Sequence, residues 1–176
     1  IEELMHYVKG PGFPTGGIIQ GRQGIKDAFE TGRGRIVIRS KTDIEVSESG
    51  RETIVVTEIP YMVNKREMIE KIAELVENKR IEGIAYINDE TTMKGVRIVI
   101  RLKKDANSNV VLNTLFKYTP LQSSFSVNNV ALVNGRPRTL NLKELIKYFV
   151  KHRHEVVVRR TRFDLEKARK RAHILE

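Results

Sequence analysis

Residues 64–103 read NKREMIEKIAELVENKRIEGIAYINDETTMKGVRIVIRLK, and the hydrophobic period changes partway along this stretch. Over residues 65–79 the apolar side chains recur every three or four positions, which is the spacing of one face of a helix. Asn64 is placed to cap that helix, and Glu67 can complete a capping box. Over residues 96–103 apolar and basic residues alternate, which indicates a strand with one buried face. The stretch therefore predicts helix and strand within one unit.

The same kinds of element continue on both sides of this stretch. We expect further strands at residues 51–59, 84–88 and 121–133 and a second helix at residues 108–118. From residue 51 to residue 133 the order is then β-α-β-β-α-β, the split-βαβ or ferredoxin-like pattern. Two helices on one face of an antiparallel sheet would bury both apolar stripes. The expected fold class is therefore α+β, with an antiparallel sheet, helices on one face and a long C-terminal helix.

The long helix is predicted for residues 141–176, where no helix breaker occurs. Asn141 and Glu144 repeat the capping arrangement. At ~1.5 Å per residue the helix would span roughly 54 Å, which is longer than the domain it leaves. Its apolar positions thin out toward the C-terminal half, so we expect it to need a partner, as in a coiled coil. We expect that partner after residue 176 or on another chain.

The first part of the chain is expected to be a connector. A helical stub at residues 1–8 precedes a segment rich in Gly and Pro, whose spacing misses the phosphate-binding glycine motif. A short strand and a short helix follow, and a long strand is expected from residue 33 to about residue 46. The chain thus divides into a connector with a helical stub and a short helix at residues 1–32, an α+β domain at residues 33–140, and the start of a coiled-coil helix at residues 141–176.

The composition excludes several classes of protein. No stretch approaches the ~18–20 consecutive apolar residues of a membrane span. The absence of cysteine excludes disulfides, thiolate metal sites and a cysteine nucleophile, and it fits a cytoplasmic protein. The net charge of +10 indicates a polyanionic partner.

No group of residues predicts a catalytic centre. His152 and His154 are two positions apart on a helix, so they point to different sides and cannot share a metal ion. Asp89 and Glu90 close a strand without further ligands beside them. The five tyrosines are scattered, and none has the basic, motif-like setting of an activated nucleophile. We therefore expect no catalytic residue, metal site or cofactor site in these residues.

The run TGRGRIVIRSK at residues 31–41 is the strongest functional signal. On a strand, alternate positions share a face, so four cations and one valine would line one side while Ile36 and Ile38 face inward. The predicted DNA-binding residues on this strand are Arg33, Arg35, Arg39 and Lys41. Four like charges repel one another, and a phosphate backbone is their natural counterpart.

An alternative for this strand is pairing of its cations with the carboxylates of Glu45, Glu52 or Glu58. The glycines at positions 32 and 34 favour the DNA interpretation, because they would let a phosphate approach the backbone closely.

Lys65 and Arg66, at the start of the first long helix, are a second DNA-binding candidate. Cations at a helix N-terminus oppose the helix dipole, but they are favourable beside a phosphate held by free amides. A third basic group lies on the final helix, where we expect it to be solvated. No base-reading motif occurs, so the expected contacts are sequence-tolerant and depend on the DNA backbone and its deformability.

Several motifs together resemble the A subunits of bacterial type IIA DNA topoisomerases, and DNA gyrase more than topoisomerase IV. The motifs that carry the resemblance are Gly10-Pro11-x-Phe13-Pro14-Thr15, Thr31-Gly32-Arg33-Gly34, Glu58-Ile59-Pro60-Tyr61-x-Val63-Asn64-Lys65, Val130-Ala131-Leu132 and the closing His173-Ile174-Leu175-Glu176. The resemblance covers essentially the whole chain. Asn129 departs from it, because the family pattern has methionine before Val-Ala-Leu, and this bears on the packing there.

The resemblance implies a tower domain followed by the start of a coiled-coil arm. Such a fragment holds and bends duplex DNA while the whole enzyme performs ATP-dependent double-strand passage and negative supercoiling. The nucleophilic tyrosine is implied to lie upstream of Ile1, and ATP and Mg²⁺ to be bound by the B subunit. The implied partners are duplex DNA, a second A-type protomer and the B subunit, which together with the first form an A2B2 heterotetramer.

Two other functions are weighed against this one. A structural dimerisation arm would use the long helix and would not need the Arg33 and Arg35 face for DNA binding. An RNA-recognition module would stack bases on aromatic residues of its sheet, for which the predicted strands offer only Tyr86 and Phe125.

Overall fold

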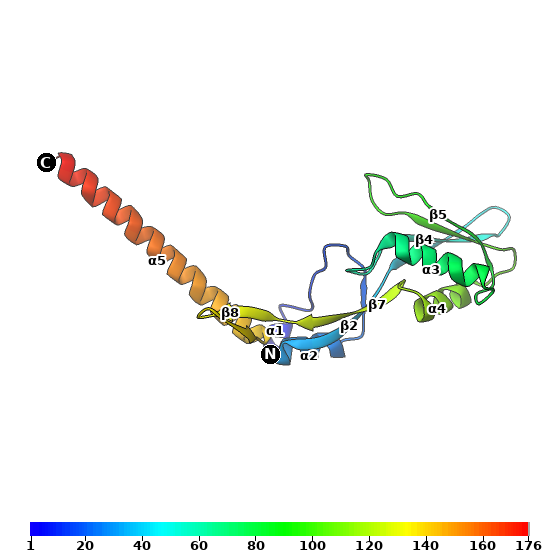
Figure 1. Cartoon of the computed structure of the whole chain (residues 1–176), viewed down its shortest axis with the longest axis horizontal. Helices are drawn as coiled ribbons and strands as arrows, with labels where there is room; N and C mark the ends of the chain where they lie inside the picture. The colour runs from blue at the N-terminus through cyan, green and yellow to red at the C-terminus, as the bar shows by residue number, and fades with distance from the viewer. Residues whose placement is uncertain (176) are drawn as a thin grey trace.

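The computed structural model describes residues 1–175, and this range forms an elongated α+β molecule with three antiparallel sheets (Figure 1). A four-stranded sheet with two helices lies at one end, and the long helix α5 (Leu142–Leu175) projects from the other. Strands β2 (Arg33–Arg39) and β7 (Gln122–Asn128) run between the two ends. The expected fold class, with antiparallel sheets and a long C-terminal helix, is confirmed.

The four-stranded unit, residues 41–121, contains the main hydrophobic core. Its strands occur in the spatial order β3 (Lys41–Val46), β4 (Glu52–Glu58), β6 (Ile98–Leu102) and β5 (Ile84–Asp89). Helices α3 (Lys65–Glu77) and α4 (Ser108–Tyr118) pack against one face of this sheet. Alternating positions of β4 and β6 supply the strand residues of the core, which are Ile54, Val56, Ile98, Ile100 and Leu102. The helices contribute Met68, Ile72 and Leu115.

Asparagine side chains cap the helices as the sequence predicts. Asn64 accepts a hydrogen bond from the Glu67 amide (3.1 Å), which is one half of the predicted capping box. At the start of α5 both halves form, because Asn141 accepts from the Glu144 amide (2.9 Å) and Glu144 accepts from the Asn141 amide (3.2 Å). These caps satisfy amides that the first turn of a helix leaves unpaired.

A smaller three-stranded unit joins the N-terminal residues to β7. Its strands are ordered β1 (Ile18–Gln20), β2 and β7, all antiparallel, and helix α2 (Gln23–Thr31) covers one face. The second core comprises Ile25 and Phe29 of α2 together with Ile36 and Ile38 of β2. The aromatic rings of Phe13, Tyr61 and Phe125 pack beside it, with centroids 5.2–5.5 Å apart. Residues expected to form a connector therefore contribute to a packed core.

The expectation of one strand from residue 33 to residue 46 is wrong. The strand breaks at the buried Ser40, and β2 and β3 belong to different sheets. The Ser40 amide donates to the Leu121 carbonyl (2.9 Å), so the chain leaves the three-stranded unit beside the point where it returns. Alternation continues through this break in the sequence, which is why the pattern does not reveal it.

The predicted ferredoxin-like arrangement also needs a correction at its last strand. The elements occur in the expected order along the chain, but β7 pairs with β2 from Arg33↔Asn128 to Arg39↔Gln122 instead of joining the four-stranded sheet. Strand β3 takes the edge position beside β4. Ser40 and Leu121 are adjacent, so β2, which precedes Ser40, and β7, which follows Leu121, can pair along seven residues.

The expected strand at residues 121–133 is likewise divided. Strand β8 (Val130–Val133) pairs with β9 (Arg136–Thr139) in a separate hairpin. Asn129 lies at the division, where its amide donates to Gly32 and its carbonyl accepts from Leu140, both at 2.8 Å. Its place in the fold is thus set by backbone hydrogen bonds.

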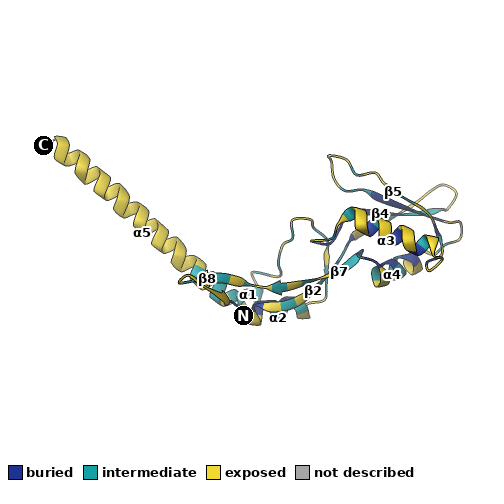
Figure 2. Ribbon diagram, in the orientation of Figure 1, coloured by how far each residue is buried: buried dark blue, intermediate teal, exposed yellow. Residues whose placement is uncertain are grey.

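Helix α5 continues to Leu175 as predicted, and Glu176 lies outside the described residues. Its surface is exposed along nearly the whole length (Figure 2). Helix α1 (Glu2–Met5) is shorter than the stub expected at residues 1–8. Within residues 1–175, no helix is both long and apolar enough to cross a membrane.

Candidate nucleic-acid interface

The face of the three-stranded sheet that α2 does not cover carries the predicted cations. Ile36 and Ile38 are each 1% exposed and face α2, so Arg33, Arg35, Val37 and Arg39 lie on the opposite side. The register places a polar residue of β7 opposite each of them. The basic face, as we name it, consists of Arg33, Arg35, Val37, Arg39, Gln122, Ser124, Ser126 and Asn128. None of these residues is acidic.

The guanidinium groups of Arg33 and Arg35 have no ion-pair or hydrogen-bond partner among residues 1–175. The three carboxylates considered as alternative partners are engaged elsewhere. Glu45 lies 3.6 Å from Arg97, Glu52 accepts from the Ser108 amide (3.2 Å), and Glu58 accepts from the Gly17 amide (3.0 Å). The alternative pairing is therefore not formed, and both guanidinium groups are exposed for an outside partner.

Arg39 is held more tightly than the other two arginines. Its Nε donates to Gln122 Oε1 (2.6 Å), and its guanidinium carbon lies 4.6 Å from the centre of the Phe116 ring. Stacking and hydrogen bonding of this kind restrict the side chain, although the terminal nitrogens can still donate. Arg39 thus joins the basic face to α4 in addition to any contact it makes with a ligand.

Lys41 was expected to share a strand face with Arg33, Arg35 and Arg39, but it does not belong to the basic face. It lies beyond the break at Ser40, and in β3 it is paired with Glu58 at a bulge. The expectation assumed one continuous strand, and the change of sheet removes its basis. Lys41 is exposed.

The two glycines beside the arginines serve packing within the chain. A Cβ atom on Gly34 would come within 2.5 Å of the Gly24 carbonyl oxygen, on the side covered by α2. A Cβ atom on Gly32 would come within 2.5 Å of the Leu140 carbonyl oxygen, and the residue has φ +82° at the C-cap of α2. The expectation that they admit a phosphate is wrong, because protein backbone occupies both spaces.

The second predicted pair of cations has carboxylate partners. Lys65 Nζ lies 2.8 Å from Asp89 Oδ2, and this ion pair, with help from Thr91, lowers the pKa of Asp89 to about 2. Arg66 pairs with Glu70 one turn along the exposed side of α3 (3.2 Å). An exposed pair of this kind contributes little to stability. A phosphate that approaches Lys65 would compete with Asp89 for the ammonium group. In this respect Lys65 and Arg66 differ from Arg33 and Arg35.

A groove of about 640 Å³ lies where the basic face meets the four-stranded unit. It contains two cations that the sequence did not single out, Lys71 of α3 and Lys117 of α4. They lie 46 positions apart in sequence (117 − 71), and only the packing of α3 and α4 places them beside Arg35. No periodic signal in the sequence could have grouped them.

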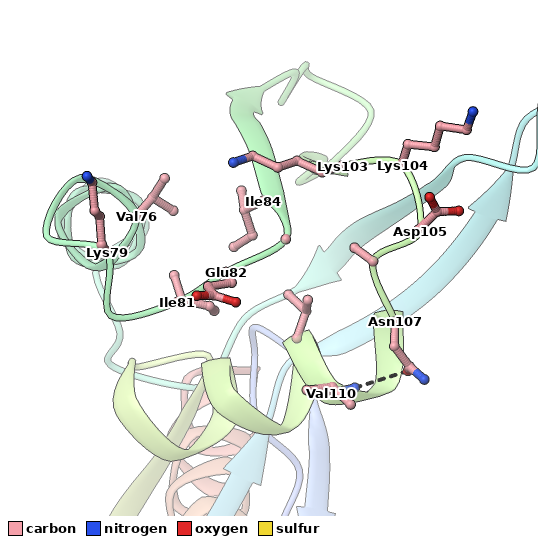
Figure 3. Close-up of a pocket in the computed structure, with 13 residues that line it drawn as sticks. Val76, Lys79, Ile81, Glu82, Ile84, Lys103, Lys104, Asp105, Asn107 and Val110 are labelled. Atoms are coloured by element: carbon pink, nitrogen blue, oxygen red, sulfur yellow. Dashed lines mark hydrogen bonds between the residues drawn. The ribbon is translucent and has the colours of Figure 1, made fainter.

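A second cavity, of about 600 Å³, lies at the other ends of α3 and α4 (Figure 3). Val76, Ile81 and Ile84 give it an apolar part, and Lys103 extends over Ile84. Lys104 also lines the cavity, and the end of its side chain points outward. These lysines lie on the loop that leads into α4, whereas Lys117 is near the end of that helix.

Residues considered for other chemistry do not converge. In the described range, no three His, Cys, Asp or Glu side chains form a group that could hold a metal ion. His152 and His154 are exposed on α5. Arg138 donates to the Tyr148 hydroxyl (3.2 Å), a basic neighbour that the sequence around Tyr148 did not indicate. Tyr86 and Phe125 lie in different sheets, so they do not form a shared base-stacking surface.

Comparison with known proteins finds relatives that match the whole length of this chain. Residues 1–176 match the model of a family described as the A subunit of DNA gyrase/topoisomerase IV. The chain is 55% identical over 176 residues to the DNA gyrase A subunit of Clostridium acetobutylicum and 60% identical over 176 residues to that of Ureaplasma parvum. It is 57% identical over 177 residues to the DNA gyrase A subunit of Staphylococcus aureus strain MRSA252. Each match covers 100% of this chain and 20–21% of the relative, so the chain spans about a fifth of the relatives' length.

Proposed function

Because this chain belongs to the family of DNA gyrase and topoisomerase IV A subunits, we propose that it holds and bends duplex DNA for a type IIA topoisomerase. The resemblance seen in the sequence motifs is confirmed by the family match. The observation that carries the proposal is the basic face, on which Arg33 and Arg35 are exposed and lack a carboxylate partner within residues 1–175. A cationic surface without internal compensation is suited to a polyanion.

The size and chemistry of the basic face fit a DNA backbone. Residues 33–39 of β2 extend over about 20 Å at ~3.4 Å per residue, and this equals roughly six base-pair steps of duplex. Beside the arginines, Ser124, Ser126 and Asn128 offer short side chains that can donate to phosphate oxygens. Contacts of this kind position a duplex without reading its bases.

The six predicted DNA-binding residues are not equivalent in this proposal. Arg33 and Arg35 contribute most because they are exposed and unpaired within the described chain. Arg39 contributes through its terminal nitrogens, and Lys41 extends the contact beyond Ser40. Lys65 and Arg66 contribute least, because a phosphate there must compete with Asp89 and Glu70.

In the whole enzyme, the fragment would support ATP-dependent double-strand passage and negative supercoiling in the cytoplasm. Residues 33–140 would form the tower domain and residues 141–176 the start of the coiled-coil arm. In this proposal a tyrosine outside this fragment cleaves the DNA, and the B subunit binds ATP and Mg²⁺. The proposed assembly is an A2B2 heterotetramer.

Fluorescence anisotropy of a labelled duplex of about 30 base pairs, measured over a salt series, tests the proposal. We expect binding that weakens steeply with salt, and the Arg33→Glu/Arg35→Glu variant should lose affinity and about 1.8 units of the log–log salt slope, since each phosphate contact contributes about 0.9. Energy transfer between dyes on the two duplex ends should rise on binding if the DNA bends. The matched control is Lys103→Glu/Lys104→Glu, which changes the net charge equally. Equal binding by the arginine variant and the wild type would contradict the assignment.

A structural arm is the second candidate function, and α5 favours it. Phe149, Val157 and Phe163 are each more than half exposed, which is unusual for a helix that has no further role in association. Sedimentation of the fragment over a range of concentrations would show self-association through α5. Dimerisation together with salt-independent or absent DNA binding would make the structural function the leading one.

A further inference from the structure

We propose that the bound duplex continues from the basic face into the adjoining groove, where Lys71 and Lys117 contact its phosphates. This inference rests on the proposed DNA-holding function and names residues of the four-stranded unit that share in it. The DNA contact would then cover both units of the molecule. The strand that the sequence pattern identifies as DNA-binding, β2, belongs to the three-stranded unit alone.

The groove and the basic face are one continuous surface. Arg35, Val37, Gln122 and Ser124 belong to the basic face and also line the groove. The remaining lining residues come from α3, from the end of α4 and the two residues after it, and from Ser123 of β7. A phosphate backbone that follows β2 and β7 toward the four-stranded unit therefore enters the groove without crossing an intervening element.

The charge of the groove favours a phosphate. Its lining contains three cations, Arg35, Lys71 and Lys117, and a single carboxylate, Glu67. Lys117 has no carboxylate partner among residues 1–175, and its Nζ lies 5.3 Å from the centre of the Tyr118 ring. Lys71 lies 4.0 Å from Glu74, but both side chains are about half exposed, so this pair is weak and easily exchanged for a phosphate.

Neutral donors complete this surface. The Tyr118 side chain is 55% exposed, and Ser124, which pairs with Val37 on the same face as Arg35, lines the groove. Hydroxyl groups donate to phosphate oxygens and do not discriminate between bases. The groove is thus suited to the same sequence-tolerant contact as the basic face.

A duplex bound in this way would bridge the junction between the two units. The chain crosses that junction at Ser40 and Leu121, and Arg39 stacks on Phe116 beside it. Phosphate contacts on β2 and on α4 together would hold the four-stranded unit in one orientation relative to the three-stranded unit. DNA bending by the fragment would then depend on both sets of cations.

The test is anisotropy of the same duplex over the same salt series with the Lys71→Gln/Lys117→Gln variant of the 176-residue chain. We expect weaker binding and a salt slope reduced by about 1.8, so that the loss of affinity between 50 and 200 mM salt is roughly twelvefold smaller. Lys103→Gln/Lys104→Gln removes the same charge at the other ends of α3 and α4 and should bind like the wild type. Thermal unfolding of each variant verifies that it is folded.

A second variant changes affinity in the opposite direction. Glu67→Gln removes the one carboxylate of the groove, and we expect roughly two- to fivefold tighter binding, the size of an exposed charge interaction. A structural role for Glu67 gives no such gain. Wild-type affinity for both groove variants, or equal losses for Lys71→Gln/Lys117→Gln and Lys103→Gln/Lys104→Gln, overturns the inference.

A variant in which both arginines of the basic face become glutamine, as the lysines do above, separates this inference from the proposed function. If Arg33→Gln/Arg35→Gln weakens binding while the groove variants do not, the basic face binds DNA and the groove is not part of the contact. If none of these variants changes binding, the proposed function fails as well.

Discussion

At the scale of single residues, the contact between Gly24 and Gly34 brings α2 directly onto β2. A Cβ atom on Gly24 would collide with the Arg35 carbonyl oxygen, and one on Gly34 would lie 2.5 Å from the Gly24 oxygen and 2.8 Å from the Ala28 amide nitrogen. The obstructing atoms belong to backbone, so a side chain could not be accommodated by a change of rotamer. This close approach positions the strand that carries Arg33 and Arg35.

We predict that Gly34→Ala destabilises the protein by about 1–3 kcal/mol, which is the usual cost of overpacking. The added methyl group must push α2 away from β2, since neither backbone can yield locally. Urea unfolding followed by circular dichroism measures the change. Gly12→Ala is the control, because a Cβ atom there meets nothing within 4 Å. A Gly34→Ala variant as stable as the Gly12→Ala variant would contradict this account of the packing.

At the scale of elements, the ion pair between Lys65 and Asp89 ties the start of α3 to the end of β5. Its atoms are 2.8 Å apart, and both side chains are about one-third exposed. The pair lowers the pKa of Asp89 from 3.8 to about 2 in the folded chain. A carboxyl group with a lower pKa in the folded state stabilises that state above its unfolded pKa and loses the effect as the pH falls through the folded pKa.

We predict that Asp89→Asn lowers stability at pH 7, and that the difference from the wild type shrinks between pH 4 and pH 2. The stabilisation is present when Asp89 is ionised and disappears when it is protonated in both states. Thermal unfolding at several pH values measures it. Glu70→Gln removes a carboxylate from the more exposed pair with Arg66 and should have a smaller effect. A difference as large at pH 2 as at pH 7 would show that Asp89 acts through something other than its charge.

At the scale of the whole molecule, the chain builds two separate hydrophobic cores, one in each unit. The larger core lies between the four-stranded sheet and helices α3 and α4, and the smaller one lies between α2 and β2. The chain passes from one unit to the other at Ser40 and returns at Leu121. Elements that share few contacts can open separately.

We predict that Ile72→Ala destabilises the larger core by about 2–5 kcal/mol and leaves the smaller core largely protected. Ile72 is a fully buried residue of α3 and belongs only to the larger core. Hydrogen exchange should accelerate in α3, α4 and β3–β6 and change little in α2 and β2. Ile36→Ala is the reciprocal variant, because Ile36 belongs to the smaller core. Uniform acceleration throughout the chain would show that the two units unfold together.

The helices and the buried side of β2 could be predicted from local patterns in the sequence. The 3.6-residue period and the cap at Asn64 identified α3, and the same reasoning placed α4 at residues 108–118 and began the long helix near Asn141. Alternation put Ile36 and Ile38 inside and the arginines outside. The unpaired state of Arg33 and Arg35 was not predictable, because it depends on where Glu45, Glu52 and Glu58 find their partners.

The sequence alone was enough to predict the α+β class, the positions of the main helices, the side of β2 on which the arginines lie and the family of the chain. These follow from short-range periodicity, capping residues and local motifs, which act over a few neighbouring positions. The three-dimensional structure was needed to show that Ser40 divides one alternating run between two sheets and that β7 pairs with β2. It was also needed to show that Lys71 and Lys117 lie beside Arg35. These outcomes depend on contacts between residues far apart in the chain, because strand pairing and helix packing satisfy hydrogen bonds and bury apolar surface that no local pattern assigns to a partner.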